Sequence, residues 1–261
     1  LREKVPGLRK PFPAHAPHLA DRARAEDPMA QEHHLTLDLS LQKALEGLAI
    51  DAVRGRGEAL QVAIVVADHR SGEILASVGS AGFVDDKRQG FVDMTTALRS
   101  PGSTLKPLVY GLAFDEGLAH PETMIDDRPT VFGTYAPQNF DKLYRGTIRV
   151  REALQMSLNI PVVMLTEALG PAKLLSAMGK AGMKYELPGG QPGLALALGG
   201  VGVTLQDMVQ LYAAIARGGV ALPLSWRMAG DRPEGQRLIG AVAAWQEIGG
   251  PHDCAPVTRS S

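Results

Sequence analysis

The residues best suited to chemistry in this sequence are a serine and a lysine three positions apart. Ser103 and Lys106 follow the turn-forming dipeptide Pro101-Gly102, and Pro107 requires any helix here to start near Ser103. On the first turn of a helix the two side chains lie on one face, where the amine can take the hydroxyl proton. The spacing therefore predicts a serine nucleophile activated by a lysine, which is acyl-transfer chemistry.

A Ser-x-x-Lys pair is not specific by itself, because the same spacing recurs at Ser40 and Lys43. The second copy opens an amphipathic helix with Leu41, Leu45 and Leu48 on one face. No turn precedes it. We therefore interpret Ser40 as part of a helix start and Lys43 as a solvated side chain.

A second polar pair, Ser157 and Asn159, lies between two predicted helices and just before Pro161. If both side chains face the cleft of Ser103, the hydroxyl could relay a proton to a leaving group. The carboxamide could then hold a substrate carbonyl and orient Lys106. The alternative interpretation is a polar connector between helices, in which Ser and Asn serve as turn residues.

The composition is that of a globular protein. The chain has 261 residues, of which 45% are hydrophobic and 21% charged, enough for one large domain or two small ones. A formal net charge of −1 gives no electrostatic case for binding nucleic acid. The single cysteine, Cys254, excludes a disulfide framework and a cysteine-based zinc site. No apolar run approaches the roughly 20 residues of a membrane span, and no signal peptide is visible.

Two further patterns are weak candidates for binding sites. His15, His18 and the pair His33-His34 lack a third ligand at a suitable spacing, so we expect polar surface residues and neither a metal nor a cofactor. The glycines of residues 199–202 precede a predicted helix, as phosphate loops do. Because this segment has no Walker lysine, we interpret it as a structural turn.

The expected elements are a β-hairpin followed by helices. Strands at residues 61–68 and 73–78 flank a turn and follow a helix capped by Asp38. The chain divides into a linker of low order over residues 1–34, a domain over residues 35–246 and an atypical tail over residues 247–261. Further helices are expected over residues 102–116, 147–156 with Thr147 as the cap, from Pro161 to Gly170, 171–180, from Thr204 to Arg217, and 236–246.

Several segments in a fixed order resemble one protein family, the class A penicillin-binding proteins, and among them the 1C type. Residues 99–107 (Arg-Ser-Pro-Gly-Ser-Thr-Leu-Lys-Pro) resemble the nucleophile segment of this family. Residues 135–141 (Tyr-Ala-Pro-Gln-Asn-Phe-Asp) resemble the loop before its second motif, and residues 151–161 resemble the segment that carries that motif. The resemblance runs from about residue 11 to about residue 246.

The resemblance implies an α+β fold, the transpeptidase fold shared with serine β-lactamases. The helical part and an N-terminal β-hairpin would be present and the later strands of the sheet missing. It implies a D,D-transpeptidase that cross-links the stem peptides of peptidoglycan and reacts with β-lactams. Ser103 would then be the nucleophile and Lys106 its base, while Ser157 would shuttle the proton and Asn159 would hold the substrate and the lysine.

The sequence departs from the family pattern at its third motif. No Lys-Thr-Gly or Lys-Ser-Gly occurs after the second motif, so we expect the chain to be truncated before it, and its serine to react poorly or not at all. By family, a glycosyltransferase domain and the membrane anchor would precede residue 1 in a bifunctional synthase. The enzyme would lie on the periplasmic face of the bacterial inner membrane, and this chain would meet the membrane only through that anchor.

Two other functions stay open at this point. The missing third motif favours a non-catalytic remnant or a partner-binding module. A serine β-lactamase on the same fold would need a deacylating glutamate in a Glu-x-x-Leu-Asn context after the second motif, and the sequence has none.

Overall fold

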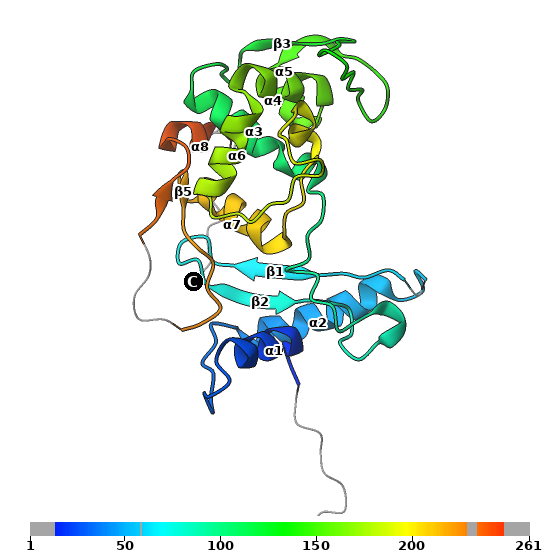
Figure 1. The fold of residues 1–261 in the computed structure, drawn as a ribbon, viewed down its shortest axis with the longest axis vertical. Coiled ribbons are helices and arrows are strands. Elements are labelled where there is room, and N and C mark those ends of the chain that lie inside the picture. Colours follow the sequence, from blue (N-terminus) through cyan, green and yellow to red (C-terminus); the bar gives the residue numbers. More distant parts are fainter. Residues whose placement is uncertain (1–13, 58, 229–233, 248–261) are drawn as a thin grey trace, which may run out of the picture.

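The structure, a computed structural model, describes residues 14–57, 59–228 and 234–247. A lower part contains the β-hairpin and an upper part contains packed helices (Figure 1). The lower part comprises α1 (Pro17–Glu26), α2 (Leu39–Val53), β1 (Ile64–Ala67) and β2 (Ile74–Val78), and a loop with the short turn η1 (Asp86–Arg88) follows. The upper part comprises η2 (Gly102–Leu105), α3 (Lys106–Asp115), β3 (Met124–Asp127), β4 (Gly146–Arg149), α4 (Val150–Gln155), α5 (Asn159–Leu169), α6 (Pro171–Lys180), η3 (Leu194–Leu198), α7 (Leu205–Ala216), β5 (Val220–Ala221), β6 (Gln236–Arg237) and α8 (Ala241–Glu247).

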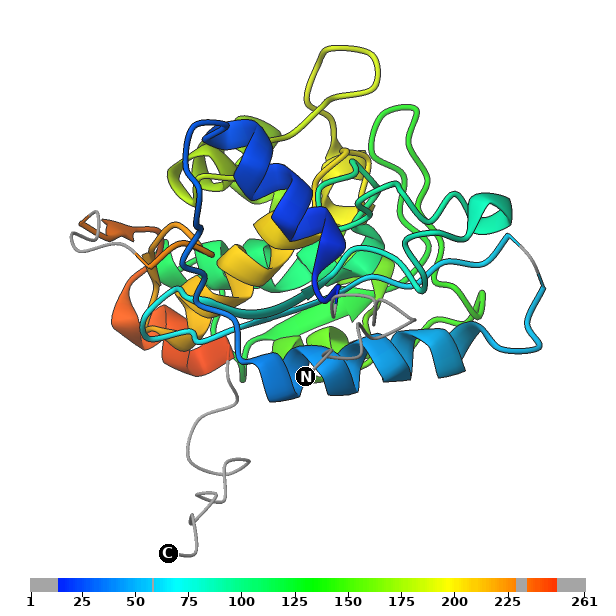
Figure 2. The same cartoon turned by 90° about the horizontal axis from the view of Figure 1, so that it is seen from below.

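The predicted β-hairpin is confirmed. β1 and β2 pair antiparallel, with Ile64 opposite Val78, and α2 runs along the hairpin (Figures 1 and 2). Asp38 caps α2 as expected, since its carboxylate accepts hydrogen bonds from the backbone N–H groups of Ser40 and Leu41. Among the described residues β1 pairs only with β2, so the other edge of β1 is open.

The N-terminal segment differs from the expectation of low order over residues 1–34, because residues 17–26 form helix α1. Leu19 and Ala23 of this helix are buried against Ile74 of β2 and against Trp226. Pro17 fits the first turn of a helix, where no intrahelical partner for its nitrogen is needed. The linker expected over residues 1–34 therefore includes a segment that packs on the hairpin.

The main hydrophobic core lies in the upper part, where α3 is the central helix. Leu108, Val109 and Ala113 of α3 are fully buried. Helices α5, α6 and α8 pack against α3, and α7 belongs to the same core and packs against α8. This central position matters for function because Lys106 is the first residue of α3. The site is therefore attached to a helix in which eight of the ten residues are buried.

One expected helix begins later than predicted. Residues 146–149 form strand β4, which pairs with β3 and places Thr147 opposite Asp126. The helix α4 begins only at Val150, with Arg149 as its N-cap. Thr147 was therefore wrongly predicted as a cap: its β-branched side chain also suits a strand, and pairing with a distant segment decided between the two.

The other expected helices agree with the structure in most of their bounds. Residues 171–180 form α6, and Thr204 caps α7 with Asp207 in a capping box. Gly170 ends α5 as predicted, although that helix begins at Asn159, before Pro161. The last expected helix is shorter, since residues 236–237 are strand β6 and only α8 is helical. Of the predicted tail, residues 248–261 lie outside the described residues.

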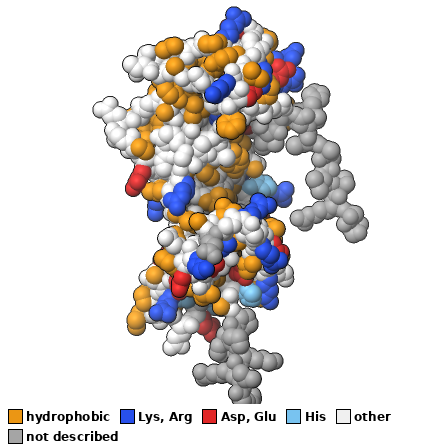
Figure 3. Space-filling view, turned by 90° about the vertical axis from the view of Figure 1, so that its right-hand side faces the viewer, with side chains coloured by type: hydrophobic (Ala, Val, Ile, Leu, Met, Phe, Trp, Pro, Cys, Tyr) orange, Lys and Arg blue, Asp and Glu red, His pale blue; other side chains and the backbone are white. Residues whose placement is uncertain are grey.

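Hydrophobic side chains reach the surface over much of the upper part (Figure 3). Within residues 14–57, 59–228 and 234–247, no single helix is long and apolar enough to cross a membrane. Only α5 and α6 taken together reach that length and composition, and they bend by 87° at their junction.

Candidate active site

The expected nucleophile lies on an exposed turn directly before the central helix. Ser103 is part of the 3-10 turn η2, and its side chain makes no hydrogen bond with the described part of the chain. The first turn was predicted as regular α-helix. It is 3-10 because Pro107 has no N–H to donate to the carbonyl of Ser103, which accepts instead from the N–H of Lys106.

The side chain of Lys106 is buried, with 1% of the residue exposed. Its Nζ lies within hydrogen-bond distance of four acceptors. These are Ser157 O (2.5 Å), Asn159 Oδ1 (2.8 Å), Ser157 Oγ (3.0 Å) and Leu158 O (3.2 Å). Burial disfavours the ammonium form and lowers the pKa of Lys106 to about 8. The amine thus lies next to its acceptors, and a larger fraction of it is deprotonated near neutral pH than for a lysine in water.

Ser157 and Asn159 reach the lysine from the junction of two helices, as the sequence indicated. Ser157 lies after α4 in the left-handed conformation, with φ 52, and Asn159 is the first residue of α5. A left-handed conformation at a residue other than glycine costs of the order of 1 kcal/mol and is common at functional sites. It aims both the carbonyl and the hydroxyl of Ser157 at Lys106. The structure thus brings Lys106, Ser157 and Asn159 together, while their roles in catalysis stay predictions.

The loop after η3 supports the nucleophile turn from behind. Ser100 Oγ donates to the carbonyl oxygen of Gly199 at 2.7 Å. Gly199 itself is left-handed, with φ +89, and a β-carbon there would lie 2.3 Å from the nitrogen of Gly102. The glycine-rich segment, interpreted from sequence as a structural turn, therefore packs against Gly102, the residue before Ser103.

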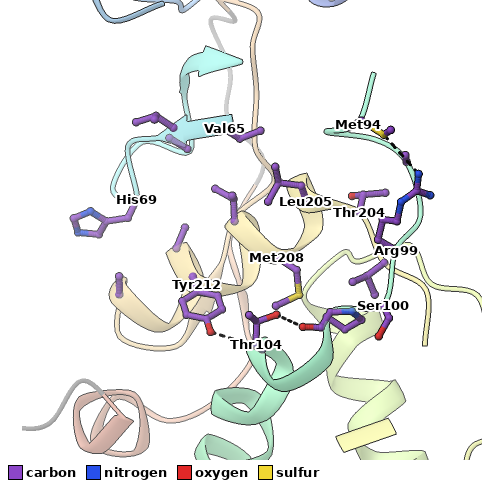
Figure 4. A pocket seen from close by; sticks show the side chains of 18 residues that line it. Val65, His69, Met94, Arg99, Ser100, Thr104, Thr204, Leu205, Met208 and Tyr212 are labelled. Atoms are coloured by element: carbon purple, nitrogen blue, oxygen red, sulfur yellow. Dashed lines mark hydrogen bonds between the residues drawn. The ribbon is translucent and has the colours of Figure 1, made fainter. Parts of the chain in front are cut away.

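A cavity of 780 Å³ opens beside this turn, between β1 and α7 (Figure 4). Val65 of β1 and Met208 of α7 line it, together with Ser100 and Thr104 of the nucleophile segment. Tyr212 closes one side and donates a hydrogen bond to the carbonyl of Thr104 at 2.9 Å. None of the four predicted site residues is among its lining residues.

The histidines of the N-terminal segment have partners within the protein. His15 Nδ1 lies 2.7 Å from Glu46 Oε2, and His18 Nε2 lies 2.8 Å from the carbonyl of Gly90. In the described ranges, no group of three or more His, Cys, Asp or Glu side chains is placed to hold a metal ion.

Sequence reasoning missed the residues that support the site from a distance. Asp127 and Asn139 are buried polar residues behind Asn159, and Gly199 backs the nucleophile turn. Asn139 lies in the loop at residues 135–141 that carried part of the family resemblance. That loop was the only signal in the sequence that could have led to it.

Comparison with known proteins now identifies the family. The transpeptidase domain of penicillin-binding proteins matches residues 62–241, which is well over half of the chain. The chain belongs to this family. The predicted family resemblance is confirmed, and a penicillin-binding-protein transpeptidase domain is what residues 62–241 represent.

Named relatives and solved structures agree with this membership. Penicillin-binding protein 1C of Escherichia coli K12 is 44% identical over 212 residues, covering 80% of this chain and 27% of that protein. Penicillin-binding protein 1B of Vibrio cholerae is 32% identical over 209 residues, covering 76% of this chain and 25% of that protein. The chain thus spans about a quarter of the length of these relatives.

The same fold is found in the PonA1 protein of Mycobacterium tuberculosis, solved in complex with penicillin V. It superposes with a TM-score of 0.71 at 22% identity, covering 88% of this chain and 69% of that one. At this identity the likeness shows the fold alone. The predicted α+β fold of the penicillin-binding proteins is thereby confirmed.

Proposed function

We propose that this chain carries the acyl-serine site of a D,D-transpeptidase that cross-links peptidoglycan stem peptides and binds β-lactams. One observation carries the proposal: the buried amine of Lys106 contacts both Ser157 Oγ and Asn159 Oδ1, one turn after the exposed Ser103. Membership in the transpeptidase family gives the reaction class.

Lys106 is suited to act as the base because its amine is neutral often enough near pH 7. With a pKa of about 8, about one molecule in ten carries a neutral amine at pH 7, compared with a few in ten thousand for a lysine in water. The neutral amine can accept the hydroxyl proton of Ser103 as the oxygen attacks.

In the proposed acylation, Ser103 Oγ forms a bond to the carbonyl carbon of the penultimate D-Ala of a stem peptide. The peptide bond to the terminal D-Ala then breaks. The proton taken by Lys106 passes through Ser157 Oγ, which lies 3.0 Å from Nζ, to the departing amine. Asn159 keeps the lysine in place with its Oδ1. D-Ala leaves, and the stem peptide stays on the serine as an ester.

In the second step, the amine of a neighbouring stem peptide attacks this ester. The C–N bond of the cross-link forms, and the ester bond to Ser103 breaks. The amine loses a proton and the Ser103 oxygen regains one through the same lysine and serine. A β-lactam would acylate Ser103 by opening its ring, and the reaction would stop there because no amine resolves the ester.

The finer parts of this proposal concern the longer protein. The relatives are bacterial penicillin-binding proteins, which act on the cell wall. We propose that the longer protein is a bifunctional synthase, with glycosyltransferase and transpeptidase activities, on the periplasmic side of the inner membrane. The proposed domain is residues 35–246, and no cofactor takes part in either step. Residues 162–261 contain no Lys-Thr-Gly or Lys-Ser-Gly. Within this chain, the oxyanion on the substrate carbonyl oxygen therefore lacks one expected donor, at a cost of about 10²–10³ in rate. The reaction of this chain should accordingly be slow.

Labelling with a fluorescent penicillin tests the proposal. Ser103→Ala should abolish the labelled band, while Ser40→Ala, which changes the equivalent serine of the other Ser-x-x-Lys pair on the exposed start of α2, should leave it intact. Unchanged labelling of Ser103→Ala would contradict the proposal. Continuous turnover of a chromogenic β-lactam would instead indicate a serine β-lactamase.

A further inference from the structure

A buried amide and carboxylate lie behind Asn159, where the proposed mechanism does not use them. Asp127, the last residue of β3, is 0% exposed, and Asn139 of the following loop is 4% exposed. Asn139 Nδ2 lies 2.9 Å from both carboxylate oxygens of Asp127 and 2.8 Å from the carbonyl oxygen of Leu143. The backbone N–H of Arg145 donates to Asp127 at 2.8 Å.

These contacts fix the orientation of the Asn139 carboxamide. A backbone carbonyl only accepts hydrogen bonds, so the group of Asn139 that faces Leu143, and with it Asp127, is the NH₂. The carboxamide oxygen must therefore point the other way. There it accepts a hydrogen bond of 2.8 Å from the backbone N–H of Asn159.

The same loop also orients the side chain of Asn159. Asn159 Nδ2 donates to the carbonyl oxygen of Gln138 at 2.7 Å, which leaves Oδ1 to accept from Lys106 Nζ at 2.8 Å. Asn159 opens α5, where the N-cap residue Leu158 supplies no side-chain acceptor. Both the backbone and the side chain of Asn159 are thus held by two adjacent loop residues.

Burying the polar groups of Asp127 and Asn139 costs free energy that a purely structural connection between β3 and α5 would not need. Asp127 forms no ion pair with the described residues, and the donors to its buried carboxyl group are the neutral Asn139 Nδ2 and the backbone N–H of Arg145. A buried carboxylate held in this way is costly, and an apolar contact would join β3 to α5 more cheaply. An apolar contact, however, could not fix the orientation of the carboxamide groups of Asn139 and Asn159.

We propose that Asn139, held by Asp127, is a positioning residue that fixes Asn159 Oδ1 on the amine of Lys106. This deepens the proposed function and rests on it, because the benefit of a fixed Lys106 is the proton transfer from Ser103. Asn139 acts through Asn159 and does not touch the reacting atoms.

The pKa of Lys106 distinguishes the two possible roles of Asn139. If Asn139 only stabilised the fold, its replacement would leave this pKa unchanged. A hydrogen bond to the ammonium form raises a lysine pKa, so loss of the Asn159 oxygen lowers it. The measurement is the pH titration of the Lys106 ¹³Cε NMR signal in the protein labelled at lysine, assigned with Lys106→Met. Asn139→Ala should lower the midpoint below about 8 by about one pH unit, as should Asn159→Ala.

A double-mutant cycle separates positioning from a general loosening of the fold. In the Asn159→Ala background, Asn139→Ala should produce no further change in the midpoint, because its effect runs through Asn159. The matched control is Gln42→Ala. Gln42 is another buried amide, 1% exposed, which joins α2 to Ser77 of β2 and to the carboxylate of Glu46. The Gln42→Ala variant should be less stable than the original protein, but the midpoint of the Lys106 titration should not change.

Several results would overturn the proposal. These are an unchanged midpoint in Asn139→Ala, an equal fall in both backgrounds, or an equal fall in Gln42→Ala. If Asn139→Ala does not fold, Asp127→Asn takes its place under the same criteria, since it preserves shape and removes the acceptor-only group that orients Asn139. The titration needs no penicillin. A failure of positioning is therefore distinct from a failure of Ser103 to be acylated.

Discussion

Gly199 is packed directly against the backbone of Gly102, the residue that precedes the proposed nucleophile. A β-carbon at position 199 would lie 2.3 Å from Gly102 N and 2.5 Å from Gly102 Cα. Neither atom belongs to a flexible side chain that could move aside. The conformation of the turn that carries Ser103 therefore depends on the absence of a side chain at position 199.

Gly199→Ala should displace this turn and slow the acylation of Ser103 by about 10²-fold, the effect of moving a reacting group by about 1 Å. The measurement is the rate of labelling by a fluorescent penicillin. Gly189→Ala is the matched control, because Gly189 has a similar φ of +86 and a β-carbon there would have no atom within 4 Å. It should carry the cost of the left-handed conformation alone and label at the original rate. Equal rates for both variants would refute the packing argument.

Lys106 should titrate far below the range of an ordinary lysine, because burial disfavours its ammonium form. The ¹³Cε signal should show a midpoint of about 8. Since the neutral amine is the proposed base, the acylation rate should rise with pH up to that midpoint and then level off. A midpoint near 10.5, the value for a lysine in water, would contradict the proposed role.

Ser157 allows backbone strain and chemistry to be separated at one position. Ser157→Gly removes the hydroxyl and suits the left-handed φ of 52, whereas Ser157→Ala removes the hydroxyl and keeps the strain. Both variants should acylate slowly, because both lose the contact between the hydroxyl and Lys106 Nζ and keep only the contact of the backbone carbonyl. Urea unfolding should show the glycine variant as the more stable by about 0.5–1 kcal/mol. Normal acylation in either variant would remove Ser157 from the proton relay.

Glu247 should make the protein less stable as the pH rises. Its Oε1 is buried without a hydrogen-bond partner among the described residues, and burial raises the pKa of Glu247 well above its usual 4.5. The folded state therefore keeps this proton at a pH where the unfolded chain has lost it. The free energy of unfolding should fall as the pH rises above about 4.5.

Urea unfolding between pH 4 and 8 measures this effect. Glu247→Gln should flatten the fall, whereas Glu116→Gln, which changes an exposed carboxylate paired with Lys173, should preserve it. A wild-type stability that does not depend on pH in this range would contradict the assignment of Glu247 as a buried neutral acid.

Local patterns were enough to predict the elements that depend on neighbouring residues. Asp38 and Thr204 were recognisable as caps because their hydrogen bonds close within three residues. The Ser103 turn was recognisable from Pro101-Gly102, and its change to a 3-10 turn follows from the missing N–H of Pro107. The spacing within each motif was likewise visible in the sequence.

The parts that were missed depend on contacts between distant segments. Helix α1 is rich in polar residues, and its burial comes from Trp226, far along the chain. Strand β4 exists because β3 pairs with it, which no property of Thr147 alone reveals. The support of Asn159 by Asn139 joins residues 20 positions apart. In each case, local propensity was overridden by tertiary contacts.

The residue that forms the acyl-enzyme is the central claim, and mass spectrometry identifies it directly. After long incubation with excess benzylpenicillin, intact-mass analysis should show slow addition of one penicillin, and peptide mapping should place it on Ser103. The adduct should be absent from Ser103→Ala. An adduct on any other residue, or an equal adduct in Ser103→Ala, would contradict the account.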